Sequence, residues 1–170
     1  MKIAGCAFVA LGSNLGDSRS NVGRSIDDLR QLSERPILVS SLWESAPVDC
    51  PPGSPMFVNA VVRLTSMAGE TPESLLAKLQ AMEKDAGRRP KKIFNEPRPL
   101  DLDLIAFGNE IRSTPQLILP HPRAHQRRFV LQPLNEIAPE LVLPGQSKTV
   151  AQLLEELPLE PGVTKISQVF

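Results

Sequence analysis

The sequence is poor in several residue types, and each scarcity excludes a class of protein. Its 170 residues include two cysteines, one tryptophan and no tyrosine. Cys6 and Cys50 are too few and too far apart for a disulfide framework or a zinc site. No apolar run approaches the roughly 18–20 residues that cross a membrane. We therefore expect a cytoplasmic protein that does not bind a membrane, and the sequence makes no required protein partner evident.

Several signatures of nucleotide-binding enzymes are missing as well. The chain has no G-x-x-x-x-G-K-[ST] loop and no G-x-G-x-x-G loop, and Ser13 does not lie in the G-x-S-x-G context of a nucleophile elbow. The segment 12–16 has two glycines between a predicted strand and a predicted helix, which is a weak signal for a phosphate-binding loop. The chain also has no tyrosine, one tryptophan and no basic RNP-like strand, whereas RNA-binding modules commonly stack bases on strand aromatics. Nucleic acid is therefore not an expected ligand. The alternative to an enzyme is a module that binds RNA or a regulatory small molecule.

The residues that are present predict one globular domain over 1–170. Hydrophobic residues make up 41% of the chain and charged residues 22%, which are ordinary values for a globular protein. Apolar runs predict strands over 6–11, 36–45, 57–64 and 100–104. Apolar residues at helical spacing predict helices after the first and third of these strands. The helices begin with caps at Asp17 or Ser18 and at Thr71.

The order strand, helix, strand, strand, helix, strand predicts a ferredoxin-like α+β fold. We expect an antiparallel sheet with helices on both faces and with additions at the C-terminal end. The additions are a short helical pattern over 129–137, interrupted by Pro133, and a final helix at Thr149, which fits a capping box with Gln152.

The segment 97–104 contains the most informative pattern in the chain. If it forms a strand, its three leucines share one face, and Asp101 and Asp103 share the other, roughly 6.5–7 Å apart. Two like charges on one strand face cost stability unless a cation or good solvation offsets them. Carboxylates at this spacing suit Mg²⁺, which commonly binds one or two carboxylates together with substrate phosphates. The alternative is that both aspartates simply lie on the solvated face of a sheet.

Positive charge is concentrated in two segments, although the net charge of the chain is zero. Residues 84–98 contain six basic and two acidic side chains, and residues 121–128 contain three arginines and no acid. Such local concentration favours an anionic ligand of limited size over a long polyanion. A solvated basic loop is the simpler alternative for each segment taken alone.

Both histidines of the chain, His121 and His125, lie in the second basic segment. Arginine forks match phosphoryl oxygens and histidine can donate a hydrogen bond to them, so the segment suggests phosphate binding. A His-x-x-x-His metal pair is the weaker alternative, because it needs a helix just after Pro122 and lacks the glutamate of a zinc protease signature. The residues therefore favour an enzyme that binds a nucleotide through Mg²⁺ carboxylates and arginines, without a P-loop.

Five ordered motifs, which together extend over nearly the whole chain from about residue 6 to residue 157, resemble one enzyme family. The motifs are Leu11–Gly16, Phe57–Ala60, Pro97–Asp103, Pro120–Arg123 and Arg127–Leu134, the last continued by Asn135–Glu140. In order and spacing the chain is similar to the 6-hydroxymethyl-7,8-dihydropterin pyrophosphokinases of folate synthesis. The resemblance implies transfer of pyrophosphate from ATP to the hydroxymethyl oxygen of the pterin, with release of AMP.

The resemblance also implies roles for individual residues. Asp101 and Asp103 would hold two Mg²⁺ ions that bridge the phosphates of ATP, and with Arg88, Arg98 and His121 they would form the catalytic set. The residues implied to line the ATP side are Gln80, Glu83, Arg88, Arg98, His121 and Arg127.

The pterin side follows from the same resemblance. Phe57 and Phe129 would sandwich the pterin ring, and Asn59 would hydrogen-bond its polar edge. Main-chain groups near Ser45, Pro47 and Val48 would complete the recognition of the pterin.

The chain departs from the family pattern in the loop before Pro97. Phe94-Asn95-Glu96 stands where the family commonly has Arg-Trp-Gly, and Pro90 replaces an arginine often found two positions after Arg88. The loop between Val48 and Phe57 is about one residue longer than in the bacterial form. A family member with weakened activity or an altered substrate is therefore the alternative within the family.

Overall fold

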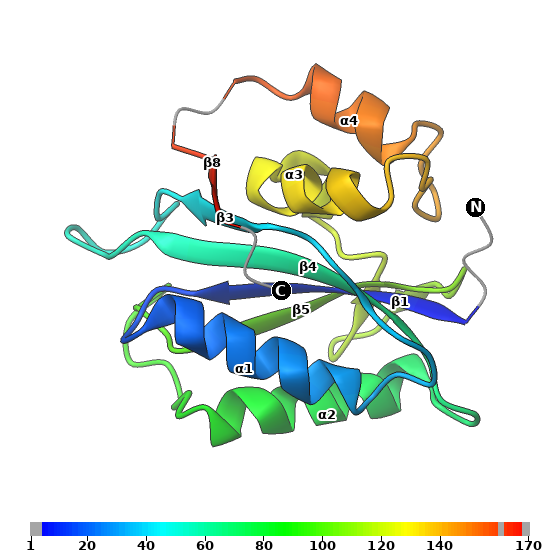
Figure 1. The fold of residues 1–170 in the computed structure, drawn as a ribbon, viewed down its shortest axis with the longest axis horizontal. Coiled ribbons are helices and arrows are strands. Elements are labelled where there is room, and N and C mark those ends of the chain that lie inside the picture. The colour runs from blue at the N-terminus through cyan, green and yellow to red at the C-terminus, as the bar shows by residue number, and fades with distance from the viewer. Residues whose placement is uncertain (1–4, 160–161, 168–170) are drawn as a thin grey trace.

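An antiparallel sheet forms the middle layer of the molecule, with helices on both sides of it (Figure 1). The computed structural model describes residues 5–159 and 162–167. The strands lie in the order β5 (Asp101–Phe107), β1 (Cys6–Ser13), β4 (Phe57–Thr65), β3 (Leu42–Ser45) and β8 (Thr164–Ser167), while β2 (Leu38–Val39) also pairs with β4. All these pairs are antiparallel. Without β8, this is the predicted ferredoxin-like sheet.

Two layers of helices cover the sheet, as predicted (Figure 1). The helices α1 (Ser18–Arg30) and α2 (Pro72–Asp85) lie on one face, and α3 (Arg128–Ile137) and α4 (Val150–Glu156) lie on the other. The smaller elements are β6 (Arg112–Ser113), which pairs with β7 (Ile118–Leu119), and the 3₁₀ turn Ala124–Gln126. None of the helices in the described part of the chain combines the length and the apolar character needed to cross a membrane.

Strand β1 shows how the sequence builds two cores. Its side chains alternate between the faces of the sheet, as strand geometry requires. Val9 and Leu11 lie in the core shared with α1 and α2, whereas Phe8 and Ala10 lie in the core shared with α3 and α4. Because both faces are covered, β1 is apolar on both of them.

The predicted caps lie at the predicted helix starts. The Asp17 side chain accepts a hydrogen bond from the amide of Ser20, 3.2 Å away, at the start of α1. Thr71 and Ser74 form a reciprocal capping box at α2, and Pro72 takes the first helical position. The predicted box of Thr149 with Gln152 is present at α4.

The structure differs from the sequence prediction in three places. The extended run 36–45 is split into β2 and β3 because the Ser40 hydroxyl accepts the hydrogen bond from the amide of Val61 and interrupts the ladder. The helix α3 continues through Pro133, because its buried residues hold it on the sheet despite one lost backbone bond. Strand β8 extends the sheet beyond β3 and was not predicted.

Candidate functional site

A pocket opens on the α3 face at the end of the sheet, beyond the part that α3 and α4 cover. Its volume is about 340 Å³, within the range of small-molecule sites. Gly12 on β1 forms its floor and pairs with Asn59 on one side and with Asp101 on the other. A Cβ at this position would lie 3.5 Å from both the Asn59 side chain and the Phe57 ring. The absence of a side chain at Gly12 therefore keeps the floor open between two walls.

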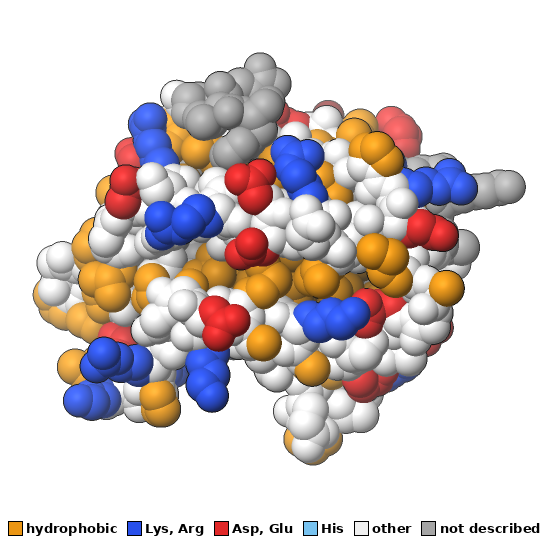
Figure 2. Space-filling view, turned by 60° about the horizontal axis from the view of Figure 1, so that its bottom comes forward, with side chains coloured by type: hydrophobic (Ala, Val, Ile, Leu, Met, Phe, Trp, Pro, Cys, Tyr) orange, Lys and Arg blue, Asp and Glu red, His pale blue; other side chains and the backbone are white. Residues whose placement is uncertain are grey.

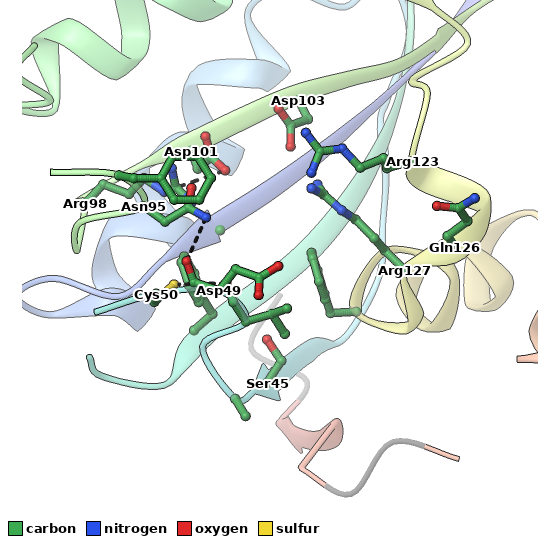
Figure 3. A pocket seen from close by; sticks show the side chains of 16 residues that line it. Ser45, Asp49, Cys50, Asn95, Arg98, Asp101, Asp103, Arg123, Gln126 and Arg127 are labelled. Atoms are coloured by element: carbon green, nitrogen blue, oxygen red, sulfur yellow. Dashed lines mark hydrogen bonds and ion pairs between the residues drawn. The ribbon is translucent and has the colours of Figure 1, made fainter. Parts of the chain in front are cut away.

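Asp101 and Asp103 form one wall of the pocket, on the same face of β5 (Figure 3). Arg88 binds Asp101 with a 2.8 Å hydrogen bond from Nη1 to Oδ1, and it also pairs with Glu83. The Glu83 carboxylate accepts a hydrogen bond from the amide of Leu102, 3.2 Å away. The end of α2 is thereby tied to the acidic strand.

Arg98 lies beside the carboxylate of Asp101, and hydrogen bonds of its backbone hold it there. Its amide donates to the side-chain oxygen of Asn14 at 2.9 Å, and the amide of Asn14 donates back to the Arg98 carbonyl at 3.1 Å. The buried Nε of Arg98 has no hydrogen-bond partner in the described part of the chain and lies 3.8 Å from Asp101 Oδ2. The segment 12–16 therefore positions an arginine, and Gly12, at the end of β1, is the residue of this segment that lines the pocket.

Asp103 faces two further arginines across the pocket. Arg123 and Arg127 point their guanidinium groups toward it (Figure 3). Burial, together with the neighbouring Asp101, raises the pKa of Asp103 to about 6, although the surrounding arginines act in the opposite direction. The charge of Asp103 is thus poorly solvated and lies beside a like charge, which is a condition that a bound cation would relieve.

The donor set fits Mg²⁺ better than a metal held by protein ligands alone. Among residues 5–159 and 162–167, no group of three or more His, Cys, Asp or Glu side chains is arranged to hold a metal. Mg²⁺ commonly takes one or two carboxylates and completes its octahedron with waters and substrate phosphates. Asp101 and Asp103 provide the two carboxylates that such a site needs.

Two phenylalanines lie at the other side of the pocket, each under an arginine. Phe57 on β4 has the Arg98 guanidinium 5.6 Å from its ring centre, and Phe129 on α3 has that of Arg127 at 5.5 Å. These four residues all line the pocket. A flat ring that enters between the phenylalanines would therefore meet the same arginines that face the carboxylates.

Asn59 lies under the pocket with a fixed orientation. Its Nδ2 donates to the carbonyl of Trp43 at 3.2 Å and to the hydroxyl of Ser45 at 2.8 Å. The nitrogen must point this way, because a carbonyl can only accept. The remaining atom, Oδ1, lies beside Gly12, so Asn59 offers the pocket an acceptor.

Two loops meet over the mouth of the pocket. Asn95 donates from Nδ2 to the Asp49 carbonyl at 2.9 Å (Figure 3), and both residues have left-handed backbone angles, φ 52° and 51°. Asparagine and aspartate tolerate this conformation better than most residues. Phe94 and Cys50 line the pocket beside them. Lys and Arg side chains also gather at this end of the molecule, at the lower left in Figure 2.

The pocket brings together eight of the residues predicted for the site: Ser45, Val48, Phe57, Arg98, Asp101, Asp103, Arg127 and Phe129. Six others lie outside its lining: Pro47, Asn59, Gln80, Glu83, Arg88 and His121. Of these, Asn59, Glu83 and Arg88 contact lining residues or their strands, Pro47 lies between two of them, and Gln80 is exposed on α2.

His121 is half-buried and contacts the backbone of Arg123. Its Nδ1 accepts a hydrogen bond from the amide of Arg123 at 3.2 Å. Burial and the positive charges of Arg127 and Arg123 lower the pKa of His121 to about 4. The imidazole is therefore neutral near pH 7, and its Nε2 carries the proton that it can donate.

The sequence prediction missed several lining residues, of which Arg123 and Asp49 carry charge. Arg123 had a signal, because it lies in the basic segment 121–128. Asn95 lies in the loop that departs from the family pattern, which draws attention to the loop but not to a contact with the pocket. No pattern in the sequence indicates Asp49 or Cys50, because loop residues approach the pocket through the loop backbone and not through a periodic pattern.

The fold is ferredoxin-like, and the site is a pocket that combines paired carboxylates and arginines with two phenylalanines. A sequence model of the 7,8-dihydro-6-hydroxymethylpterin-pyrophosphokinase (HPPK) family matches residues 8–139. The chain belongs to the HPPK family.

Relatives of nearly equal length share much of the sequence. The 2-amino-4-hydroxy-6-hydroxymethyldihydropteridine pyrophosphokinase of Pseudomonas aeruginosa is 40% identical over 161 residues, which cover 94% of this chain and 95% of the relative. The enzyme of the same name from Haemophilus influenzae is 37% identical, with 88% and 91% covered. These names give no support to the altered-substrate alternative.

Solved structures agree on the fold. Wild-type Plasmodium falciparum HPPK-DHPS with pteroate superposes with a TM-score of 0.69 at 14% identity, covering 89% of this chain. The chain spans 42% of that protein. At this identity the likeness confirms the fold alone.

Proposed function

We propose that this protein transfers pyrophosphate from ATP to the hydroxymethyl group of 6-hydroxymethyl-7,8-dihydropterin and releases AMP, in the cytoplasm. The observation that carries the proposal is the pocket itself. Paired carboxylates and convergent arginines lie at one side of it, and two phenylalanines with an asparagine acceptor lie at the other. The names of the relatives from P. aeruginosa and H. influenzae support the same activity.

Asp101 and Asp103 would hold Mg²⁺, as two ions with ATP as co-substrate. When bound, the metal neutralises phosphate charge and orients the phosphate chain. Support comes from the raised pKa of Asp103, which reflects the burial of this carboxylate and its position beside Asp101. Glu83 and Arg88 hold Asp101 in place, so the pair is oriented before a ligand enters.

The arginines act on the phosphate chain. The reaction forms a bond from the pterin hydroxymethyl oxygen to the β-phosphorus and breaks the bond from that phosphorus to the oxygen that leaves with AMP, while the hydroxyl proton is released to water. Arg98 and Arg127 lie between the carboxylates and the phenylalanines, where the transferred group must pass. Reactions of this kind depend mainly on positioning and charge stabilisation, so no covalent nucleophile is needed.

His121 completes the ATP side as a neutral donor. With the pKa lowered to about 4, it keeps one N–H that can bind a phosphate oxygen at neutral pH. Gln80 lies one turn before Glu83 on α2, on the side where the nucleoside of ATP would extend from the phosphates.

The phenylalanines and the strand edge would bind the pterin. Phe57 and Phe129 stack on its two faces, and Oδ1 of Asn59 accepts from N–H groups of the 2-amino-4-oxo edge. The main chain around Ser45, Pro47 and Val48 supplies the remaining hydrogen bonds. A flat ligand edge that offers donors beside an acceptor matches this arrangement.

Binding of the pterin alcohol with and without a non-hydrolysable ATP analogue tests the proposal. Isothermal titration should give tight pterin binding only when Mg²⁺ and the analogue are present, since the arginines under which the ring stacks also hold the phosphates. Absence of pterin binding under every condition would refute the proposed substrate. Binding that is unaffected by the analogue would contradict the shared pocket.

A further inference from the structure

Glu136, in the last turn of α3, joins three elements of the fold. Its Oε1 accepts a 2.5 Å hydrogen bond from Nε1 of Trp43, and its Oε2 accepts one of 2.8 Å from the hydroxyl of Ser41. The ammonium group of Lys165 on β8 lies 3.4 Å from the same Oε2. One carboxylate therefore ties α3 to the edge of the sheet through both of its oxygens.

Trp43 connects Glu136 to Asn59, which lies under the pocket. Trp43 on β3 is the register partner of Asn59 on β4, and its carbonyl accepts one of the two hydrogen bonds from Nδ2 of Asn59. The second bond goes to Ser45, two residues further on β3. A shift of β3 near Trp43 would therefore turn the amide whose Oδ1 faces the pocket.

Glu136 is also connected to the pocket along α3, through Phe129. Phe129 precedes Glu136 by seven residues on α3, so the two residues lie on the same side of the helix, two turns apart. Fixing Glu136 on β3 therefore fixes the rotation of the helix that presents Phe129 to the pocket.

We infer that Glu136 is a positioning residue of the pterin subsite, which acts through Trp43 on Asn59 and through α3 on Phe129. The inference rests on the proposed function, because it assigns the pterin side of the pocket to these residues. Glu136 itself does not line the pocket. Its effect must therefore appear in the affinity for pterin and not in the affinity for ATP.

Two variants separate hydrogen bonding from charge. Glu136→Ala removes both acceptors. Glu136→Gln keeps an acceptor for the indole and can donate to the Ser41 hydroxyl, which also accepts, so it loses only the contact with Lys165. Glu140→Gln is the matched control, because Glu140 is an exposed acid four residues further along and has no hydrogen bond or ion pair in the described part of the chain.

The chain supplies its own spectroscopic probe. Trp43 is the single tryptophan, and there is no tyrosine, so the intrinsic emission reports on the indole that Glu136 binds. Glu136→Ala should shift this emission, while Glu136→Gln and Glu140→Gln should leave it close to that of the native protein.

Titration with the pterin alcohol in the presence of Mg²⁺ and the non-hydrolysable ATP analogue measures the Kd for pterin in each variant. We expect Glu136→Ala to raise the Kd for pterin about tenfold, with the Kd for the analogue changed less than twofold. Glu136→Gln should restore most of the affinity. Trp43→Phe should weaken pterin binding as well, and Glu136→Ala should have a smaller effect in that background than in the native protein, because the two residues share the contact that leads to Asn59.

A shift in Trp43 emission with pterin affinity within twofold of native would overturn the inference, since the contact would then be only structural. Equal weakening of pterin and analogue binding would overturn it as well. If Glu136→Ala does not fold by circular dichroism, Trp43→Phe decides alone, and native-like pterin binding by that variant contradicts the inference. Failure of the native protein to bind pterin is a different result, because it refutes the proposed function first.

Discussion

Replacing Asp103 by asparagine should abolish the chemistry and stabilise the metal-free protein. The pKa of Asp103 lies at about 6, against an ordinary value of 3.8. The charged carboxylate is therefore less favourable in the folded protein than in the unfolded chain, because it is desolvated and lies beside Asp101. Asparagine has nearly the same shape and carries no charge, so it avoids this cost.

The size of the effect follows from the shift. Each pKa unit corresponds to 1.36 kcal/mol, so a shift of about two units sets an upper bound near 3 kcal/mol. Partial exposure of Asp103 reduces this to roughly 1–3 kcal/mol. The folded state binds the proton more readily between pH 3.8 and 6. The penalty is therefore complete above pH 6 and disappears as the pH falls toward 3.8.

Urea unfolding in EDTA, followed by the emission of Trp43, measures the difference. Asp103→Asn should exceed the native protein in free energy of unfolding at pH 8, and the gap should narrow at pH 4.5. Asp85→Asn, an exposed site at the end of α2, is the control and should show no such gap. A variant no more stable than native at pH 8, or a gap independent of pH, would refute the reasoning.

Three further predictions concern single side chains of the site. Arg98→Lys keeps the charge but not the planar fork over Phe57, so kcat should fall about ten- to a hundredfold in steady-state assays of AMP release; an unchanged kcat would contradict the role of the fork. Phe129→Ala should raise the Kd for pterin about tenfold and leave that for the ATP analogue unchanged, and equal effects on both ligands would argue against stacking. The pKa of His121 is about 4 in the folded protein and 6.5 in the unfolded chain. As the pH falls, the unfolded chain therefore takes up the proton first. The contribution of His121 to the free energy of unfolding is complete above pH 6.5 and is lost as the pH drops toward 4. Between pH 7 and pH 4.5, the urea midpoint should fall less for His121→Gln than for the native protein. An identical fall in both proteins would refute the burial of a neutral imidazole.

Most of the fold was predictable because the main local signals agreed with the final structure. The alternation of apolar side chains, the caps at Asp17 and Thr71 and the capping box at Thr149 all point to the elements that form. The break at Ser40 was not predictable, because a side chain takes over a backbone hydrogen bond there. Strand β8 follows a loop and pairs with residues far away in the sequence, so no local pattern announces it.

The candidate site also has a part that local pattern predicts and a part that it does not. Asp101 and Asp103 share a strand face that the leucine alternation already fixes. The contact between Asn95 and Asp49 and the contact between Glu136 and Trp43 join segments 46 and 93 residues apart. Such contacts depend on how loops and helices meet in three dimensions, which residue spacing does not determine.

The central claim is that Asp101 and Asp103 organise Mg²⁺ and ATP for pyrophosphate transfer to the pterin alcohol. Chromatographic assay of AMP formed from ATP, Mg²⁺ and 6-hydroxymethyl-7,8-dihydropterin tests it most directly, with Asp85→Asn as the charge-matched control. The native protein and the control should release AMP at similar rates. Asp101→Ala and Asp103→Ala should lose about a thousandfold or more of that rate. Full activity in either alanine variant would contradict the two-carboxylate site.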